Sequence, residues 1–84
     1  MAGNHSPASL VEFIARAIVD HPDDVEVEVE EEEGDDRVIL HLYVADDDMG
    51  KVIGKQGRIA NAMRDLVKVA AVQAGVRASL DIGD

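Results

Sequence analysis

Apolar positions near the start of the chain recur with helical spacing. Ser6-Pro7 is a typical helix entry, with serine as the N-cap and proline at the first helical position. Ser9 and Glu12 offer an alternative, slightly later start as a capping box. Proline cannot continue a helix, so His21-Pro22 ends it. The pattern predicts one amphipathic helix, whose apolar face is Leu10, Ile14, Ala17 and Ile18.

Three other stretches alternate between apolar and polar residues, which is typical of strands with one buried face. They are Val25 to Glu30, Arg37 to Val44 and Val76 to Ile82. Only a short turn around Gly34 separates the first two, which predicts an antiparallel hairpin. The third strand follows two helices, so a right-handed crossover can place it parallel to the second. In the second strand, one side is Val38, Leu40, Leu42 and Val44, and the other is Ile39, His41 and Tyr43.

Between the second and third strands the spacing becomes helical again. Asp46-Asp47-Asp48 is a run of N-cap residues, and a short helix is predicted from Met49 to Ile53. Gly54 to Gly57 breaks this helix. A long helix then runs from Arg58 to about Ala74, and Gly75 is a natural C-cap. The predicted apolar stripe of the long helix is Ile59, Met63, Leu66, Val67, Ala70 and Ala74.

The order helix, strand, strand, short helix, long helix, strand predicts an α+β fold. Strands with one polar face need helices on only one side, so we expect a three-stranded mixed sheet with the helices packed on one face. The length of 84 residues suits one small domain. We expect a flexible N-terminus over residues 1–8 and a single domain over residues 9–84.

The composition narrows the classes of function. The chain has no cysteine, so neither a disulfide framework nor a thiolate metal site is expected. Its three histidines are scattered, and no Ser/His/Asp or Cys/His set appears, so we expect no metal, no cofactor and no enzyme. No apolar run approaches the roughly 20 residues of a membrane span, and residues 1–9 lack signal-peptide features. A cytoplasmic location is therefore expected.

The net charge of −10 argues against a polyanion partner, but the charges are segregated. Eleven acidic residues and no lysine or arginine lie between Asp20 and Asp36. Five basic residues and one acid lie between Lys51 and Lys68. Charges are screened beyond roughly 8 Å at physiological salt, so a local basic patch can act although the rest of the chain is acidic. We interpret Glu30 to Asp36 as a solvated hairpin tip that aids solubility, and Glu26, Glu28 and Glu30 as residues that protect an edge strand from aggregation.

The basic stretch contains a glycine-hinged turn, Gly54-Lys55-Gln56-Gly57, directly before the long helix. Glycine permits close approach of a phosphate backbone, and a helix N-terminus favours an anion. Lys55 and Arg58 supply cations, and Gln56 adds hydrogen bonds. The spacing fits neither a P-loop nor a Rossmann fingerprint, and a plain helix–helix turn is the alternative interpretation. The candidate binding residues are Lys51, Val52, Ile53, Gly54, Lys55, Gln56, Gly57, Arg58 and Ile59.

The stretch Val52-Ile53-Gly54-Lys55-Gln56-Gly57-Arg58-Ile59, set between a short and a long helix, resembles the signature of the KH domain, whose GXXG loop clamps about four nucleotides. The extra helix and strand before the core resemble the type II arrangement. With Asp20-His21-Pro22-Asp23-Asp24 and Asp48 to Gly54, the chain is similar to the small bacterial KhpA family from about Ser9 to Ile82.

The resemblance implies a protein that binds single-stranded RNA and acts as an RNA chaperone. It also implies a homodimer, or a complex with a larger multidomain KH partner of the KhpB type, in cell elongation and envelope synthesis. In the family, bases lie in an apolar groove beside the loop. The groove candidates are Val52, Ile53, Ile59, Leu40 and Leu42, with simple core as the alternative.

Val69 and Val72 lie off the apolar stripe of the long helix and are candidates for a dimer interface. Partly exposed surface residues are the alternative interpretation. A protein–protein interaction module with weak or secondary nucleic-acid binding is therefore a second hypothesis for function. Single-stranded DNA as the ligand is a third.

Overall fold

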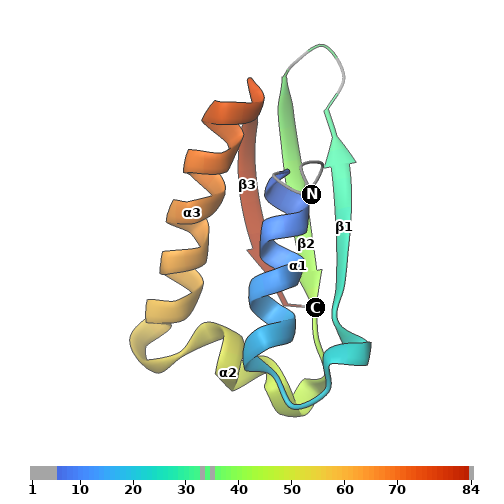
Figure 1. Cartoon of the computed structure of the whole chain (residues 1–84), viewed down its shortest axis with the longest axis vertical. Coiled ribbons are helices and arrows are strands. Elements are labelled where there is room, and N and C mark those ends of the chain that lie inside the picture. The colour runs from blue at the N-terminus through green and yellow to red at the C-terminus, as the bar shows by residue number, and fades with distance from the viewer. Residues whose placement is uncertain (1–5, 33, 35, 84) are drawn as a thin grey trace.

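The computed structural model describes residues 6–32, 34 and 36–83. Figure 1 shows the helices and strands, which follow one another in the predicted order. Three single turns of 3-10 helix, at Pro22–Asp24, Asp46–Asp48 and Lys55–Gly57, connect them. The helices and strands are α1 (Pro7–Ile18), β1 (Glu26–Glu31), β2 (Arg37–Tyr43), α2 (Met49–Ile53), α3 (Arg58–Ala74) and β3 (Arg77–Ile82).

The sheet has the strand order β1-β2-β3. β1 pairs antiparallel with β2, with Glu26 opposite Tyr43, which confirms the predicted hairpin. β2 pairs parallel with β3, with Leu40 opposite Leu80, which confirms the predicted crossover pairing. In Figure 1, α1 lies in front of the strands and α3 lies beside it. α1 contacts β1 and β2, whereas α3 contacts β3. The fold is therefore α+β, with a three-stranded mixed sheet, as the sequence predicts.

Local capping residues explain where the helices begin and end. The Ser6 hydroxyl accepts a hydrogen bond from the Ser9 N–H at 3.1 Å, and Pro7 is the first helical residue. Ser9 therefore lies inside α1, and the alternative capping box is wrong. Glu12, its proposed partner, pairs instead with Arg16 at 3.1 Å. α3 ends at Gly75, whose left-handed φ of 78° closes the helix as predicted.

The buried faces of α1 and α3 overlap the predicted ones but are rotated from them. Met63, Val67 and Ala70 are buried as predicted, and Ile14 and Ile18 pack against the core. In α1 the buried residues are Pro7, Val11 and Ala15, while the predicted face residue Ala17 is exposed. In α3, Leu66 is 45% exposed, and Ala74 is exposed as well. On α3 the small side chains of Ala60, Ala70 and Ala71 let the helix pack closely against α1 and the sheet. The buried residues of α3 are Ala60, Met63, Val67, Ala70 and Ala71.

β1 is an edge strand, and its inner face is only partly covered. Val25, just before the strand, is buried, and Val27 is half-buried. Val29 is 51% exposed, so the prediction of one buried face for this strand is wrong at this position. On β2, Leu40 and Leu42 are buried as predicted, because this central strand lies beneath the helices. The core therefore centres on β2 and on the facing sides of the helices.

Candidate nucleic-acid interface

The Gly54–Gly57 loop joins α2 to α3 through an unusual backbone. Gly54 has φ 74° and ψ 176°, and Gly57 has φ 74° and ψ 15°. Gln56 is left-handed too, with φ 57°. The Gly54 N–H donates to the Gly50 carbonyl at 2.9 Å, and the Gly57 N–H donates to the Gly54 carbonyl at 3.2 Å. Three of four consecutive residues thus have positive φ, which fixes a tight turn between two helices.

The two glycines meet different surroundings. A Cβ atom at Gly54 would lie 2.7 Å from Cγ1 of Ile59, so the loop backbone packs directly against this side chain. At Gly57 the nearest atom to a Cβ would be Nδ2 of Asn61 at 3.8 Å, an ordinary contact. Gly54 is therefore required by both space and conformation, whereas Gly57 is required by conformation alone.

The loop presents the N-terminus of α3 without a capping side chain. Gly57 occupies the N-cap position, and the first turn of the helix contains no acidic residue. The backbone N–H groups of a first helical turn lack partners within the helix and favour an anion. Lys55 and Arg58 are exposed, and within the described part of the chain neither forms an ion pair. The structure therefore brings two available cations to an uncapped helix end.

Within the described residues, Lys51 is paired with a carboxylate, unlike Lys55 and Arg58. Its ammonium lies 3.2 Å from Oδ2 of Asp20, in an ion pair that joins α2 to the segment after α1. The sequence predicts Lys51 as a binding residue because it belongs to the same basic stretch as Lys55 and Arg58. A local sequence pattern cannot reveal that a carboxylate 31 positions earlier in the chain pairs with this lysine.

The predicted groove residues divide into two groups. Ile53 is 39% exposed and Ile59 is 38% exposed, and they flank the loop on either side in the sequence. Val52, Leu40 and Leu42 are at most 1% exposed and belong to the core. Ile53 and Ile59 are therefore the apolar surface next to the loop, while the side chains of the other three support the sheet and α2 from inside.

Asp48 has a role that the sequence pattern does not reveal. The pattern predicts a cap for the short helix, but Asp48 makes no side-chain capping hydrogen bond to α2. Its side chain is fully buried, and its carboxylate accepts the N–H of Asp20 at 3.1 Å and the N–H of His21 at 2.9 Å. Burial raises the pKa of Asp48, but these two hydrogen bonds, with His21 and Lys51 nearby, lower it below its ordinary value overall.

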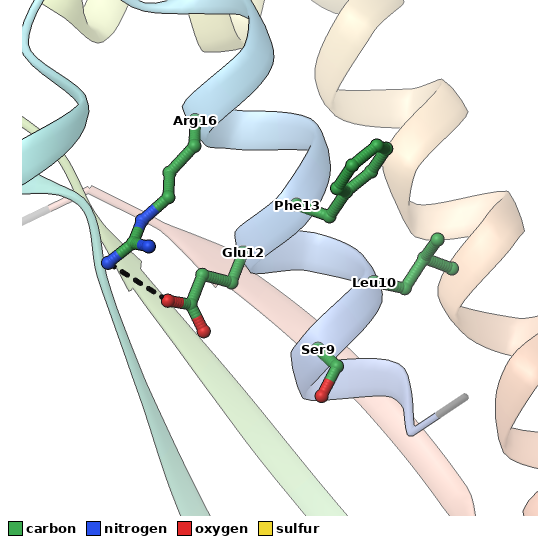
Figure 2. A pocket seen from close by; sticks show the side chains of 5 residues that line it. All are labelled: Ser9, Leu10, Glu12, Phe13 and Arg16. Carbon is green, nitrogen blue, oxygen red and sulfur yellow. Dashed lines mark ion pairs between the residues drawn. The ribbon is translucent and has the colours of Figure 1, made fainter. Parts of the chain in front are cut away.

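An exposed apolar surface lies on the helical layer, away from the loop. Val69 and Val72 are 58% and 78% exposed, and Leu66 precedes them on α3 with helical spacing. Phe13 on α1 is 73% exposed. Figure 2 shows Phe13 and Leu10 on the side of α1 where α3 lies, and the paired Glu12 and Arg16 on the other side. These four side chains of α1, together with Ser9, line a hollow of about 370 Å³.

The sequence pattern identifies the two valines of this surface but not Phe13. The sequence does contain a signal for Phe13: it is an aromatic residue on an amphipathic helix, directly before Ile14 of the predicted apolar face. The rotation of α1 puts Val11 and Ala15 inward and leaves Phe13 outside.

Within residues 6–32, 34 and 36–83, no helix has the length and hydropathy needed to cross a bilayer. Within the same ranges, no group of histidine, aspartate and glutamate side chains is arranged to hold a metal ion.

The fold and the glycine loop define a class of protein. An α-β-β-α-α-β order, a mixed sheet and a GXXG turn between the last two helices are the features of a type II KH domain. A family model described as the KH domain of KhpA/KhpB matches residues 8–82. The chain belongs to this KhpA/KhpB family.

Similar proteins agree with this assignment. The chain is 56% identical over 78 residues to the RNA-binding protein KhpA of Halalkalibacterium halodurans, covering 90% of this chain and 97% of that protein. It is 53% identical over 73 residues to the RNA-binding protein KhpA of Clostridium acetobutylicum, covering 87% and 95% of the two chains. The KhpA of Bacillus subtilis is 45% identical over 75 residues, covering 89% and 90%.

A solved structure of Aquifex aeolicus Era shares the fold. The match has a TM-score of 0.63 and 17% identity, and it covers 98% of this chain and 31% of Era. A structure of Era with 16S ribosomal RNA nucleotides matches with a TM-score of 0.62, 17% identity and 98% and 30% coverage. At this identity the likeness concerns the architecture alone.

Proposed function

We propose that the chain binds single-stranded RNA by holding its backbone at the Gly54–Gly57 loop. The observation that carries this proposal is the uncapped N-terminus of α3, flanked by Lys55 and Arg58, neither of which is paired with a carboxylate in the described residues. The similar proteins are named RNA-binding proteins, which supports RNA over other polyanions.

Each part of the loop has a distinct task in this proposal. Loop and first-turn N–H groups donate to phosphate oxygens, and Lys55 adds a point charge. Arg58 forks onto a phosphate with two parallel hydrogen bonds. Bases lie against Ile53 and Ile59, which are partly exposed beside the loop. This recognition rests on backbone contacts and van der Waals packing, since the chain has only two aromatic residues on which bases could stack.

The decisive experiment reverses the charge of the loop. In Lys55→Asp with Gln56→Asp, we expect RNA binding to be lost, because two carboxylates face the phosphates. The fold should remain, because aspartate tolerates the left-handed backbone of position 56. Fluorescence anisotropy with a labelled single-stranded RNA measures binding, and circular dichroism checks the fold.

Lys68→Asp with Gln73→Asp is the matched control. It makes the same two chemical changes at exposed positions of α3 away from the loop. If the loop variant binds RNA as well as this control does, the proposal is wrong. Competition between RNA and DNA oligomers of the same sequence decides between the two nucleic acids.

The exposed surface of α3 favours a second candidate function, association with another protein. Val69 and Val72 are more than half exposed, and apolar side chains in such a cluster mark interaction surfaces. The partner in this proposal is a second copy of the chain or a larger KH protein of the KhpB type. Val69→Glu and Val72→Glu should abolish association in light scattering while leaving the loop intact. If function in cells survives these changes but not the loop variant, RNA binding is primary.

The wider role proposed is that of a cytoplasmic RNA chaperone in circuits that affect cell elongation and envelope synthesis. The support is the family membership. Crosslinking in cells, followed by sequencing of the bound RNA, tests this role. Enrichment of envelope-related transcripts with the wild-type chain, and its loss with the loop variant, is the expected result.

A further inference from the structure

The segment that follows α1 is fixed to α2 by a buried carboxylate. α1 ends at Ile18, and the chain then continues through Asp20 and His21. Both backbone N–H groups donate to the two oxygens of Asp48, at 3.1 and 2.9 Å, and Asp48 itself is fully buried. A buried carboxylate with a hydrogen bond on each oxygen holds its donors in a defined position.

This attachment sets the position of the Asp20 side chain. With its backbone held at Asp48, the Asp20 carboxylate lies 3.2 Å from the ammonium of Lys51 on α2. Lys51 is 43% exposed and Asp20 is 69% exposed, so water and other anions reach the pair. Exposed ion pairs of this kind are weak, and a competing anion can displace one partner.

Lys51 differs in this respect from the other cations near the loop. It lies four residues before Lys55, and the Gly54 N–H to Gly50 carbonyl bond continues its helix into the loop. Among the described residues, Lys55 and Arg58 form no ion pair, while Lys51 has Asp20. Of three cations around the loop, one is thus already neutralised by the protein.

We propose that Asp20, positioned by Asp48, competes with RNA phosphate for Lys51 and thereby weakens the RNA affinity of the loop. This inference rests on the proposed RNA-binding function. Lys51 is then a reserve phosphate contact, and Asp20 is a residue that sets affinity without touching RNA.

The test removes the competing carboxylate without removing its backbone N–H. Asp20→Asn keeps the donor to Asp48, so the fold is retained, and frees Lys51. We expect RNA to bind roughly two- to fivefold more tightly, the range set by an exposed ion pair. The salt dependence should also steepen by about 0.7 in slope, as for one further phosphate contact on a single strand.

Two controls separate this effect from a general change in charge. Asp23→Asn changes the net charge equally, at an exposed position nearby that forms no ion pair among the described residues. It should leave affinity within about 1.5-fold, because a solvated charge that is paired with none of the loop cations is screened by salt. In a Lys51→Gln background, Asp20→Asn should have no effect, because the competed cation is absent.

The outcomes distinguish this inference from the proposed function. If wild-type chain binds RNA, the loop variant does not, and Asp20→Asn binds no better than wild type, the inference alone is overturned. Equal gains from Asp20→Asn and Asp23→Asn also overturn it, because the effect is then one of net charge. If the wild-type and loop-variant chains bind RNA equally, both proposals fail.

Discussion

At the scale of single residues, the two glycines of the loop are needed for different reasons. Gly54 has a backbone conformation open almost only to glycine, and its Cα faces Ile59 so closely that a methyl group would overlap it. Gly57 is left-handed but has free space around it. The two positions therefore tolerate alanine to different degrees, although the sequence motif treats them as equivalent.

We predict that Gly54→Ala destabilises the fold by about 2–4 kcal/mol, from backbone strain together with overpacking. Gly57→Ala should cost only about 1–2 kcal/mol, the penalty of a left-handed residue. Urea unfolding followed by circular dichroism measures both.

Gly50→Ala is the control for these two variants. Gly50 lies within α2, and a methyl group added to its Cα would meet no atom of another element within 4 Å, so alanine there should be neutral or slightly stabilising. Equal losses at Gly54 and Gly57 would contradict the assignment of a steric role to Ile59.

At the scale of elements, Asp48 joins two helices that are far apart in the sequence. Its two hydrogen bonds hold the end of α1 against the start of α2, and α2 leads directly into the loop. The hydrogen bonds also lower the pKa of Asp48 in the folded protein. A carboxyl group with a depressed folded pKa stabilises the fold above its unfolded pKa, and this contribution is lost as the pH falls through the folded value.

We predict that the melting temperature of Asp48→Asn lies below that of the wild type at pH 7. This difference should persist down to about pH 5 and begin to shrink near the ordinary aspartate pKa of about 3.9. It should be lost as the pH falls through the lower folded pKa, where the buried wild-type carboxylate becomes protonated. Thermal melts at a series of pH values from 7 to 3 measure it.

Asp47→Asn makes the same change in charge at an exposed neighbouring position. It should leave the melting temperature almost unchanged at every pH. A gap between wild type and Asp48→Asn that stays constant down to pH 3 would show that Asp48 acts through shape and not through charge.

The bounds of the elements could be predicted from the sequence, but the faces of the helices could be predicted only in part: Met63, Val67 and Ala70 are buried as predicted. Spacing and glycine positions place α2, the loop and α3 with the observed ends, because these signals are local. The choice between Leu66 and Ala71 as a buried residue of α3 depends on how closely α1 and the sheet approach, which is a tertiary property. Judged by apolar character alone, the larger Leu66 is expected to be the buried residue.

In the candidate site, too, local features could be predicted from the sequence and tertiary contacts could not. The loop and its cations Lys55 and Arg58 are contiguous in the sequence, so the motif is sufficient to identify them. The ion pair of Lys51 and the hydrogen bonds of Asp48 involve residues 27 to 31 positions away, which no local pattern reveals.

At the scale of the whole molecule, the basic loop and the acidic hairpin are separated. In Figure 1, the α2–α3 junction lies at one end of the long axis, and the end of β1 lies at the other. This axis extends 36 Å, several times the screening length of roughly 8 Å at physiological salt. The acidic residues at the hairpin end of β1 therefore have little effect on an anion held at the loop.

We predict a shallow salt dependence of RNA binding. With two or three phosphates neutralised at the loop, the slope of log affinity against log salt should be about −1.5 to −2 on a single strand. Titrations at several salt concentrations between about 0.05 and 0.3 M measure it. A slope steeper than about −4 would require a basic surface larger than the loop.

Glu31→Gln with Glu32→Gln is the corresponding control. It removes two charges from the hairpin end of the molecule and should change neither the slope nor the affinity at physiological salt. A several-fold gain in affinity would place the acidic strand against the bound RNA.

The small size of the basic loop also limits the distance over which it can attract RNA. Because the net charge of the protein is −10, its long-range field repels a strand of RNA. The attraction of Lys55 and Arg58 is confined to about one screening length, roughly 8 Å at physiological salt. RNA is therefore not steered toward this protein from a distance, and the association rate is set by diffusion and by how often a strand arrives at the loop itself.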